Sequence, residues 1–518
     1  MKRITTLLML LSLALVAAAA AASDYEGTVR AGFVATDYEG FRGVDHPSMN
    51  VYEGALLSLE GFSYRMDNGM RVTADLKSIA MNNRNLTLGI AKSGRGSLTL
   101  SHNKYQRIYG EDSGTRTRRQ VTNGRFWWQL HKSVRVFGGL GQTEKRGMYV
   151  PLFVIDTVLA IGEVDYSHLL YHGGVTFRDG RRLAQVEYYG SDFGDDVSSL
   201  NDRKSSRIRA TASAPLPNYE NIVLNAGFQH YVNRIENRDD TLRANTVWGG
   251  ARFFYGDGYV LRYSFIFDRA RRTGDLSATD NIANALYVGK TWKGQGGLML
   301  GYRYTLQDDV VDEITGNGYY VSGWARPVAK LMLKAGYGSE KSEVQAGRTL
   351  TGDADYTREW GSVKYETPYG PVRVKVENKN RDNDDIGSEV DFIRVATDMS
   401  MRLDRYGEMR GSYAYHTGEY ENSAGTFEYN GHVLSGDLMT ESYRGAQGGL
   451  SGTYYRAKQD VDVESFRVGL TARYTFESGL GMQAIYTAYN FDNLADSSPV
   501  YTEYLTTNVV EFSLSYEL

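Results

Sequence analysis

The chain shows a period of two between apolar and polar positions, and this period is clear over residues 70–77. Met70, Val72, Ala74 and Leu76 are apolar, and the residues between them are polar. Successive side chains of a β-strand point to opposite faces of a sheet, so the alternation predicts a strand with one apolar and one polar face. The pattern returns near residues 86–90 and 98–101, which predicts a run of antiparallel hairpins.

Turn residues separate these predicted strands. Asp67, Asn68 and Gly69 lie between the second and third strands, and Ser-Gly-Arg occupies residues 93–95. Residues of these types tolerate the positive φ angles of tight hairpin turns. We therefore expect residues 67–69 to supply the positive φ angles of one hairpin and residues 93–95 those of the next.

The same rhythm continues to the last residue. The first two strands are predicted near 25–33 and 55–65, and after the first hairpins further strands are predicted near 126–130 and 134–140, 169–177 and 184–188, 208–214 and 224–228, 247–253 and 259–267, 285–291 and 298–304, 320–324 and 331–337, 360–365 and 372–376, 393–401 and 409–415, 433–438 and 450–454, 466–474 and 480–489, and 510–518. We count about 26 strands of about ten residues each, the length that a tilted membrane strand needs. Short turns within pairs alternate with longer, often acidic connections between pairs, which places both chain ends on the short-turn side.

The amino terminus has the pattern of a secretory signal peptide. Lys2 and Arg3 precede an apolar run from Leu7 to Val16, and alanines lead to Ser23. We predict a signal peptide at residues 1–22 and a single barrel domain at residues 23–518. The alternative, a membrane-spanning helix, needs about 20 apolar residues.

Composition narrows the class of protein. The sequence has 57 Gly, 39 Tyr, 8 Pro and no Cys, so disulfides and covalently attached c-type haem, which needs C-x-x-C-H, are excluded for this chain. A net charge of −4 does not favour binding of nucleic acid. Together with the strands, these features predict an all-β protein: a large antiparallel β-barrel of a bacterial outer membrane, with short periplasmic turns and longer extracellular loops. The soluble alternative is a β-sandwich or a propeller array.

Few residues are candidates for chemistry. His168 and His172 are four residues apart, but on a strand they share the lumen face at a separation that suits chelation poorly. Asp382, Asp384 and Gly387 match the start of a calcium loop, but Ile393 stands where that loop needs a bidentate Glu. No catalytic set or phosphate-binding glycine motif is present, so the sequence predicts neither an enzyme nor a metal or cofactor site.

The last strand has apolar or aromatic residues at alternate positions up to the carboxyl terminus. This pattern resembles the terminal recognition strand of barrels that the outer-membrane assembly machinery inserts. The predicted assembly signal consists of Val510, Phe512, Leu514, Tyr516 and Leu518. A terminal Leu departs from the usual Phe or Trp.

The predicted width bears on function. Barrels of 16–18 strands already leave an aqueous channel, so about 26 strands would leave a wide opening. The first strand follows the predicted signal peptide directly, and no connection is long enough for a plug domain, so we expect another polypeptide to fill the lumen. The predicted inward positions are polar or charged and suit a hydrated protein contact: Arg71, Asp75, Arg207, Arg209 and Arg262.

Three segments carry a family resemblance. They are VYEGALLSLEGFSYRMDNG from Val51, TADLKSIAMNNRNLTLGI from Thr73 and EVDYSHLLYHGGVTFRDGRRLAQVEYYGSDF from Glu163. They resemble the MtrB/PioB family of barrels that accompany outer-membrane multihaem cytochromes. The resemblance implies a sheath that encloses a periplasmic decahaem or similar c-type cytochrome, with the haems on that partner. The sheath would present the cytochrome to an extracellular partner, such as an extracellular cytochrome, so that electrons cross the membrane. The N-terminal C-x-x-C of some members is absent here.

The sequence therefore leads to two hypotheses. The first is an outer-membrane sheath that holds a multihaem cytochrome across the membrane for extracellular electron transfer, in contact with outer-membrane lipid. The alternative is a general or substrate-specific diffusion porin.

Overall fold

The structure is a computed structural model that describes residues 25–40, 53–110, 115–149, 162–274, 278–308, 313–346, 353–383, 387–422, 425–460, 462–494 and 504–518. These residues form one 26-stranded antiparallel sheet. The strand count predicted from the alternation is confirmed. The predicted signal peptide lies outside the described residues.

The strands follow one another around the wall in chain order. They are β1 (Tyr25–Gly40), β2 (Gly54–Arg65), β3 (Met70–Lys77), β4 (Arg84–Lys92), β5 (Gly96–Gly110), β6 (Thr115–His131), β7 (Val134–Tyr149), β8 (Gly162–Asp179), β9 (Arg182–Asp195), β10 (Arg203–Leu216), β11 (Tyr219–Ile235), β12 (Asp240–Tyr255), β13 (Tyr259–Arg272), β14 (Thr279–Trp292), β15 (Gly296–Asp308), β16 (Glu313–Val328), β17 (Leu331–Ala346), β18 (Ala354–Thr367), β19 (Gly370–Asn383), β20 (Ser388–Arg402), β21 (Glu408–Asn422), β22 (Gly425–Met439), β23 (Ala446–Gln459), β24 (Val463–Thr475), β25 (Leu480–Asn493) and β26 (Tyr504–Glu517). In the described part of the chain, three single-turn 3-10 helices lie in connections: η3 (Ser199–Asn201), η4 (Glu236–Arg238) and η5 (Asp404–Tyr406).

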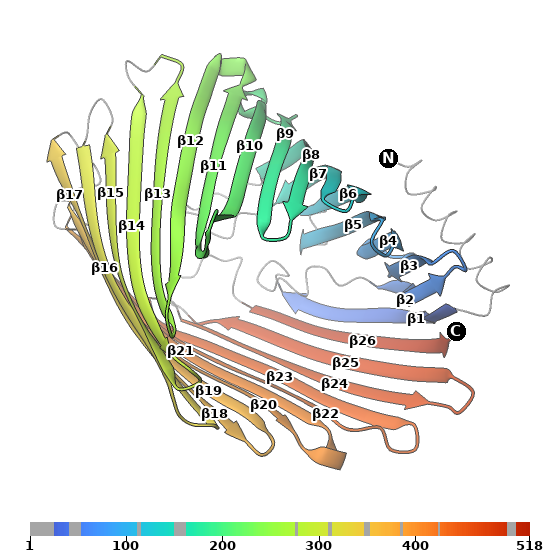
Figure 1. Ribbon diagram of the computed structural model, residues 1–518. Coiled ribbons are helices and arrows are strands. Elements are labelled where there is room, and N and C mark those ends of the chain that lie inside the picture. Colours follow the sequence, from blue (N-terminus) through green and yellow to red (C-terminus); the bar gives the residue numbers. More distant parts are fainter. Residues whose placement is uncertain are drawn as a thin grey trace.

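The sheet closes into a barrel because the first and last strands pair. β1 and β26 are antiparallel neighbours from Thr28 opposite Glu517 to Gly40 opposite Leu505, while β1 also pairs with β2. Figure 1 shows the resulting ring, in which β26 lies beside β1. Closure leaves neither end strand with an unpaired edge. The predicted fold class, a large antiparallel β-barrel of the outer-membrane type, is confirmed.

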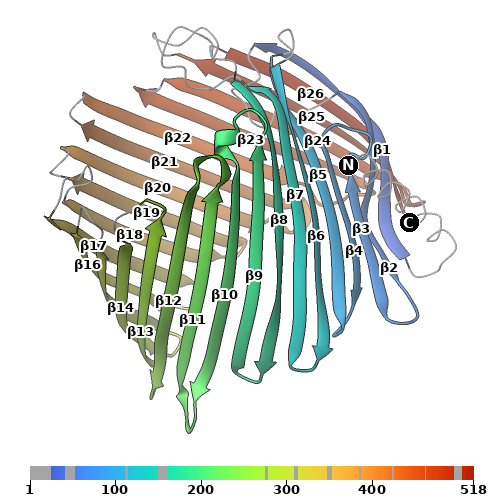
Figure 2. The ribbon, with the colours of Figure 1, turned by 90° about the horizontal axis from the view of Figure 1, so that it is seen from above.

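The connections divide between two rims. Short turns such as those of β6/β7, β8/β9 and β10/β11 lie at one rim, which we call the short-turn rim (Figure 2). The other rim, the long-connection rim, has the longer chain connections, for example the one from Gly40 at the end of β1 to Gly54 at the start of β2. β1 begins and β26 ends at the short-turn rim, where the Leu518 amide donates to the Gly27 carbonyl at 2.8 Å. Both described chain ends lie on the predicted side.

The first hairpin turn differs from the prediction. Of residues 67–69 only Gly69 has a positive φ, 76°, and of residues 93–95 only Gly94 has one, 68°. The Gly69 amide donates to the Met66 carbonyl at 2.9 Å, and the Asn68 side-chain oxygen accepts from the Met70 amide at 2.9 Å. A turn that ends in one left-handed glycine needs only that residue at positive φ, and Asn68 contributes a side-chain hydrogen bond instead.

Most strands are longer than the ten residues predicted. β8 has 18 residues, and β6 and β11 have 17 each. Backbone pairing continues past the apolar stretch toward the long-connection rim, where polar side chains on both faces erase the period of two. Residues 192–195, which lie beyond the strand predicted near 184–188, are therefore strand as well, since β9 runs to Asp195.

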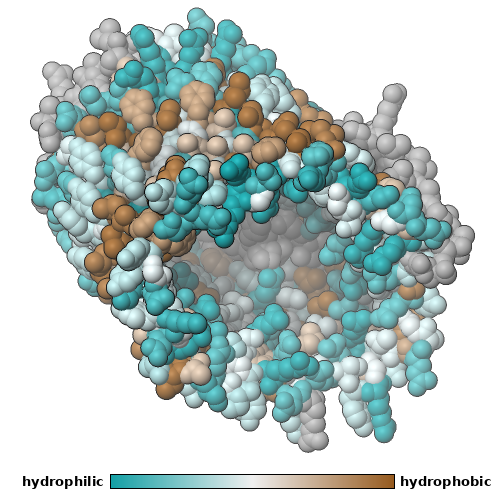
Figure 3. All heavy atoms as spheres, in the orientation of Figure 1, coloured by the Kyte–Doolittle hydropathy of each residue, from teal (hydrophilic) through white to brown (hydrophobic). Residues whose placement is uncertain are grey.

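Alternate residues face outward and into the lumen. Trp128 and Phe126 are 52% and 49% exposed and share one face of β6, while Trp127 lies on the other face. The register carries the first face around the wall through Leu140, Tyr171 and Ile208, all exposed apolar or aromatic side chains. Figure 3 shows brown apolar side chains on the outside and a largely teal wall in the hollow. An apolar outward band is what a lipid-facing barrel presents.

Strands β2–β4 carry the buried apolar cluster of the described residues. Its members pack with Tyr25, Val29, Tyr64 and Ile79; they are Leu59, Phe62, Ala74, Leu76, Leu86 and Leu88. Ala74 and Leu76, two of the alternate apolar positions of residues 70–77, lie in this cluster together with their cross-strand neighbours on β2 and β4. Among the described residues, no helix has the length and apolarity to cross a membrane.

The strand count sets the width. With about 4.8 Å between strands and a tilt of about 40°, a round barrel of this size would measure roughly 50 Å across between backbones. Among the described residues, all strands lie in the wall. The inward side chains therefore line a wide opening.

Candidate functional site: the lumen wall and the long-connection rim

The inward face of β6 and β7 is basic. Arg119, Arg125, Arg135 and Lys145 occupy inward positions, and the other inward residues of these two strands are uncharged. The Arg119 guanidinium contacts the Tyr105 hydroxyl at 3.5 Å, and the Arg135 Nε donates to the Gln129 side-chain oxygen at 3.3 Å. These contacts are to neutral groups, so this part of the wall presents positive charge to the lumen.

Inward arginines also lie over inward aromatic rings. The guanidinium carbon of Arg135 is 4.7 Å from the ring centre of Trp127. Those of Arg207 and Arg209 are each 5.1 Å from the rings of Tyr189 and Trp248. A guanidinium held over a ring keeps its planar edge of N–H donors available. This arrangement suits carboxylate or phosphate groups that approach from the lumen.

A different arrangement occurs on β18 and β19. Glu377 is only 5% exposed, and its carboxylate pairs with Arg358 at 2.6 Å, Lys375 at 2.7 Å and Lys379 at 3.6 Å. One buried carboxylate thus holds three cations. This part of the wall is organised around an internal ion network, in contrast to β6 and β7.

The predicted inward residues lie where expected. Arg71 pairs with Glu26 at 3.5 Å, and Asp75 pairs with Lys77 at 3.4 Å. Arg262 lies over the Tyr287 ring at 5.9 Å, and Arg207 and Arg209 belong to the stacked set described above. The prediction of a polar, charged lumen is confirmed at these positions.

The two candidate histidines contact other side chains. The Nδ1 atom of His172 is 3.5 Å from a Glu187 oxygen, and His168 packs edge-on against Phe193 with ring centres 5.8 Å apart. The described residues contain no group of three His, Asp or Glu side chains placed to hold a metal ion. Of the calcium-like motif, Asp382 lies within β19, Ile393 lies in β20, and Asp384 lies outside the described residues.

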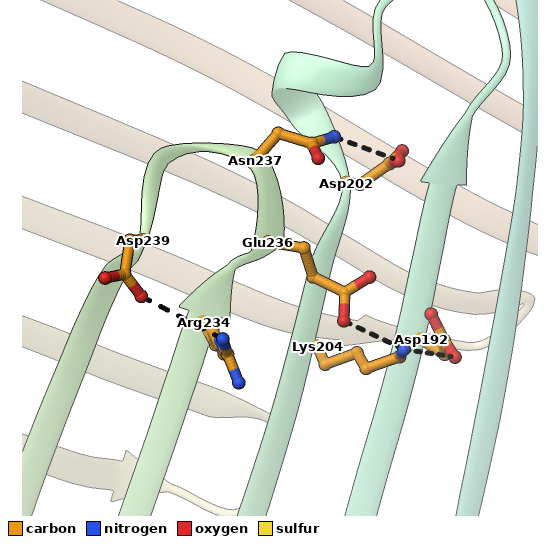
Figure 4. Close-up of polar contacts among 7 residues, drawn as sticks. All are labelled: Asp192, Asp202, Lys204, Arg234, Glu236, Asn237 and Asp239. Carbon is orange, nitrogen blue, oxygen red and sulfur yellow. Dashed lines mark hydrogen bonds and ion pairs between the residues drawn. The ribbon is translucent and has the colours of Figure 1, made fainter.

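At the long-connection rim, β9–β12 pair their charges. Lys204 lies between Asp192 at 3.8 Å and Glu236 at 2.9 Å (Figure 4). Arg234 is 3.9 Å from Asp239, and the Asn237 amide donates to Asp202 at 3.5 Å. We call this stretch, in which Lys204 and Arg234 each have a carboxylate partner, the neutralised rim.

The end of β9 is fixed by hydrogen bonds at the same rim. The Asp195 carboxylate accepts from the Asn201 side chain at 2.8 Å and from the Val197 and Ser198 amides at 3.0 and 3.2 Å. The Asn201 hydrogen bond, followed by the two amides, lowers the pKa of Asp195 below its ordinary value. A carboxylate in this setting orders the turn that leads to η3.

Comparison with known proteins finds similar structures but no related sequence. No family model matches the chain, and no curated protein matches its sequence. The siderophore receptor PirA from Pseudomonas aeruginosa has a similar structure, with a TM-score of 0.50 and 11% identity over 96% of this chain and 80% of that one. A variant of the ferric enterobactin receptor PfeA from the same organism gives 0.53 and 10% over 96% and 81%.

A third similar structure is BauA, the ferric preacinetobactin receptor from Acinetobacter baumannii. It has a TM-score of 0.53 and 9% identity over 96% of this chain and 80% of that chain. At such identities the likeness concerns the fold alone. It agrees with the assignment of this chain to large outer-membrane barrels.

The predicted assembly signal lies on the outward face of the closing strand. Val510, Leu514 and Tyr516 are exposed there, and Phe512 packs against Phe33 of β1 with ring centres 6.0 Å apart. Leu518 follows the strand end and is held by the backbone bond to Gly27. The signal thus forms part of the seam between the first and last strands.

Sequence reasoning missed the charge pairing. Glu377 and Arg358 are on different strands, and so are Lys204 and Glu236, so their contacts depend on register. The signal that could have found the basic wall was the shared inward parity of Arg119, Arg125, Arg135 and Lys145, with no acidic residue at the other inward positions of these two strands.

Proposed function

We propose that this barrel is an outer-membrane sheath that holds a multihaem c-type cytochrome across the membrane for extracellular electron transfer. The observation that carries the proposal is the basic inward face of β6 and β7, where Arg119, Arg125, Arg135 and Lys145 have no inward carboxylate beside them. The sequence resemblance to the MtrB/PioB family suggests the nature of the partner.

The width agrees with a folded occupant. A domain of about 100 residues has a radius of gyration of about 13 Å, which corresponds to a diameter of roughly 33 Å. An opening of roughly 50 Å between backbones, reduced by side chains on both sides, would admit a body of that size. A general porin of this bore would give little selection by size.

The charge of the wall agrees with a partner rich in carboxylates. Haem propionates and acidic surface residues are anionic, and Arg binds carboxylates with two parallel hydrogen bonds. The stacked arginines Arg135 and Arg207 have their N–H edges available for such contacts, whereas Arg209 lies opposite the inward Glu187. The barrel would do no redox chemistry itself; it would position the haems and separate them from lipid.

Purification of the barrel from its native outer membrane tests the proposal. We expect a haem-staining protein to remain with the barrel in about equal amounts. The variant R119E/R125E/R135E should retain at least tenfold less haem protein, because the wall would then repel carboxylates. A matched control, K364E/E366K, exchanges the partners of an inward pair at 2.6 Å and should retain the wild-type amount.

Folding of each variant is checked by the change in gel mobility on heating. A wild-type barrel that carries no haem protein and conducts ions as an open pore would overturn the sheath and favour the diffusion porin. Equal loss from the triple variant and the control would also contradict the role of β6 and β7.

A further inference from the structure

A second basic surface lies on the outward face at the long-connection rim. It comprises Arg84 of β4, Lys104 of β5, Arg116 and Arg118 of β6, and Arg146 of β7, and we call it the outer basic patch. Arg84 is opposite Lys104, Gln106 is opposite Arg118, and Arg118 is opposite Arg146. These positions share parity with Leu98, Phe126 and Leu140, so they face away from the lumen.

The height of the patch can be derived from β6. Leu130 is 62% exposed near the short-turn rim, and Arg118 lies twelve positions away on the same face. At about 3.4 Å per residue and the tilt of about 40° used above, this separation spans roughly 31 Å along the membrane normal. The apolar band of such barrels is about 25 Å tall, so Arg118 lies just beyond its outer edge.

The charge of the patch is not balanced. Arg116 and Arg118 are exposed, and the ion pairs among the described residues include neither of them. Lys104 donates to the neutral Asn82 side chain at 3.2 Å, and within the described part of the wall only Arg146 has a carboxylate partner, Asp165 at 3.0 Å. The nearby Glu144 carboxylate accepts from Gln142 at 2.9 Å. Among the described residues, these five cations share the outward face of β4–β8 at this rim with three carboxylates, Glu144, Glu163 and Asp165, which leaves an excess of positive charge.

The patch surrounds a hollow of about 290 Å³. Arg116, Arg118 and Arg146 line it together with Gln106, Gln120 and Glu144. Gln106 is only 2% exposed, and within the described part of the chain its side-chain oxygen accepts no hydrogen bond. The hollow thus offers guanidinium donors for an anion and an unused acceptor for a hydroxyl group.

We propose that the outer basic patch binds the phosphorylated sugar headgroup of an outer-leaflet glycolipid, that is, lipopolysaccharide. The outer leaflet of a bacterial outer membrane presents sugar phosphates at the outer edge of the apolar band, which is the height of Arg118. Arg binds phosphate with two parallel hydrogen bonds, and the sugar supplies hydroxyl donors for Gln106. The volume is close to the lower limit of small-molecule sites, as suits a headgroup whose acyl chains lie against the apolar band below.

The test compares the outer basic patch with the neutralised rim of Figure 4. The detergent-solubilised full-length barrel is titrated with fluorescent lipopolysaccharide at 0.15 M salt. The variant R116Q/R118Q should bind at least tenfold more weakly than wild type. The matched control K204Q/R234Q removes two outward cations at the same rim that already have carboxylate partners, and it should change the affinity less than twofold.

Two further arms separate the sources of phosphate. Enzymatically dephosphorylated lipopolysaccharide should bind at least tenfold more weakly to wild type, and 10 mM inorganic phosphate should displace less than half of the bound glycolipid. Complete displacement by phosphate would show a site for the free ion and overturn the lipid assignment. Equal losses in the two variants, or undiminished binding by R116Q/R118Q in its folded, heat-modifiable form, would overturn the site itself.

Discussion

Two sectors of the wall use the same residue types in opposite ways. In β4–β7, cations gather on both faces, with Arg119, Arg125 and Arg135 inward and Arg116 and Arg118 outward, and neutral groups or rings surround most of them. In β18 and β19, Arg358, Lys375 and Lys379 share the carboxylate of Glu377. The number of charges on a strand therefore says little about whether that strand binds a ligand. The deciding factor is whether the strand register places a carboxylate beside each cation.

The rim repeats this contrast. Lys204 and Arg234 have acidic partners beside them in Figure 4, whereas Arg116 and Arg118 lie at a comparable height and have none among the described residues. A cation that already pairs with a carboxylate must lose that contact before it binds a ligand, so its net gain is small. We therefore propose that β4–β7 bind ligands and that the ion network of β18 and β19 stabilises the wall.

The largest expected effect concerns ion selectivity of the isolated barrel. Because inward cations of β6 and β7 are not balanced, chloride should permeate better than potassium at 10 mM salt, where the Debye length of about 30 Å reaches across much of the lumen. At 1 M salt the length falls to about 3 Å and the preference should vanish. Reversal potentials in planar bilayers measure the ratio.

The charge variants sharpen this prediction. R119E/R125E/R135E should lower the chloride-to-potassium ratio at 10 mM salt by about fivefold, while K364E/E366K should leave it within a factor of 1.5. A cation-selective wild-type barrel would show that the described wall does not govern permeation and would remove the difference between the sectors.

The next effect concerns stability in the paired sector. Glu377→Gln leaves Arg358 and Lys375 without their shared carboxylate, and since these cations are 44% and 39% exposed we expect a loss of about 1–2 kcal/mol, below the usual cost for a fully buried pair. Unfolding in urea from detergent micelles measures the change. Asp192→Asn, at a carboxylate that is 48% exposed, is the control and should cost under about 0.5 kcal/mol. Equal costs would mean that burial of Glu377 adds nothing.

The sequence was sufficient for the strands but not for this contrast. Alternation such as Met70, Val72, Ala74 and Leu76 is local, so strand number and parity could be predicted residue by residue. Strands were predicted too short because their ends have polar residues on both faces, for example Asp192 on one face of β9 and Asp195 on the other. Hydrophobic periodicity carries no signal there. Pairing of Glu377 with Arg358 depends on a register that sequence periodicity does not contain.

A smaller effect is expected at a stacked cation. Trp127→Leu keeps an apolar side chain but removes the ring under Arg135, whose guanidinium carbon lies 4.7 Å from the ring centre. A cation–π contact at an exposed site contributes about 0.5–1 kcal/mol, and we expect a loss in that range in the free energy of unfolding measured in urea. Arg135→Gln in the Trp127→Leu background should then cost little more, whereas additive losses would show that the two side chains do not interact.

The smallest effect is a pH dependence at the neutralised rim. The hydrogen bond from Asn201 holds the pKa of Asp195 below its ordinary value, so the ionised carboxylate stabilises the folded barrel above that ordinary value. This stability should be lost as pH falls through the ordinary value toward the depressed pKa. Other carboxylates titrate in the same range, so the readout is the difference in unfolding midpoint between wild type and Asp195→Asn, measured at pH 6 and pH 3. We expect wild type to be slightly more stable than the variant at pH 6 and the difference to shrink at pH 3. A difference that stays constant between the two pH values would show that the Asp195 contacts do not depend on its charge.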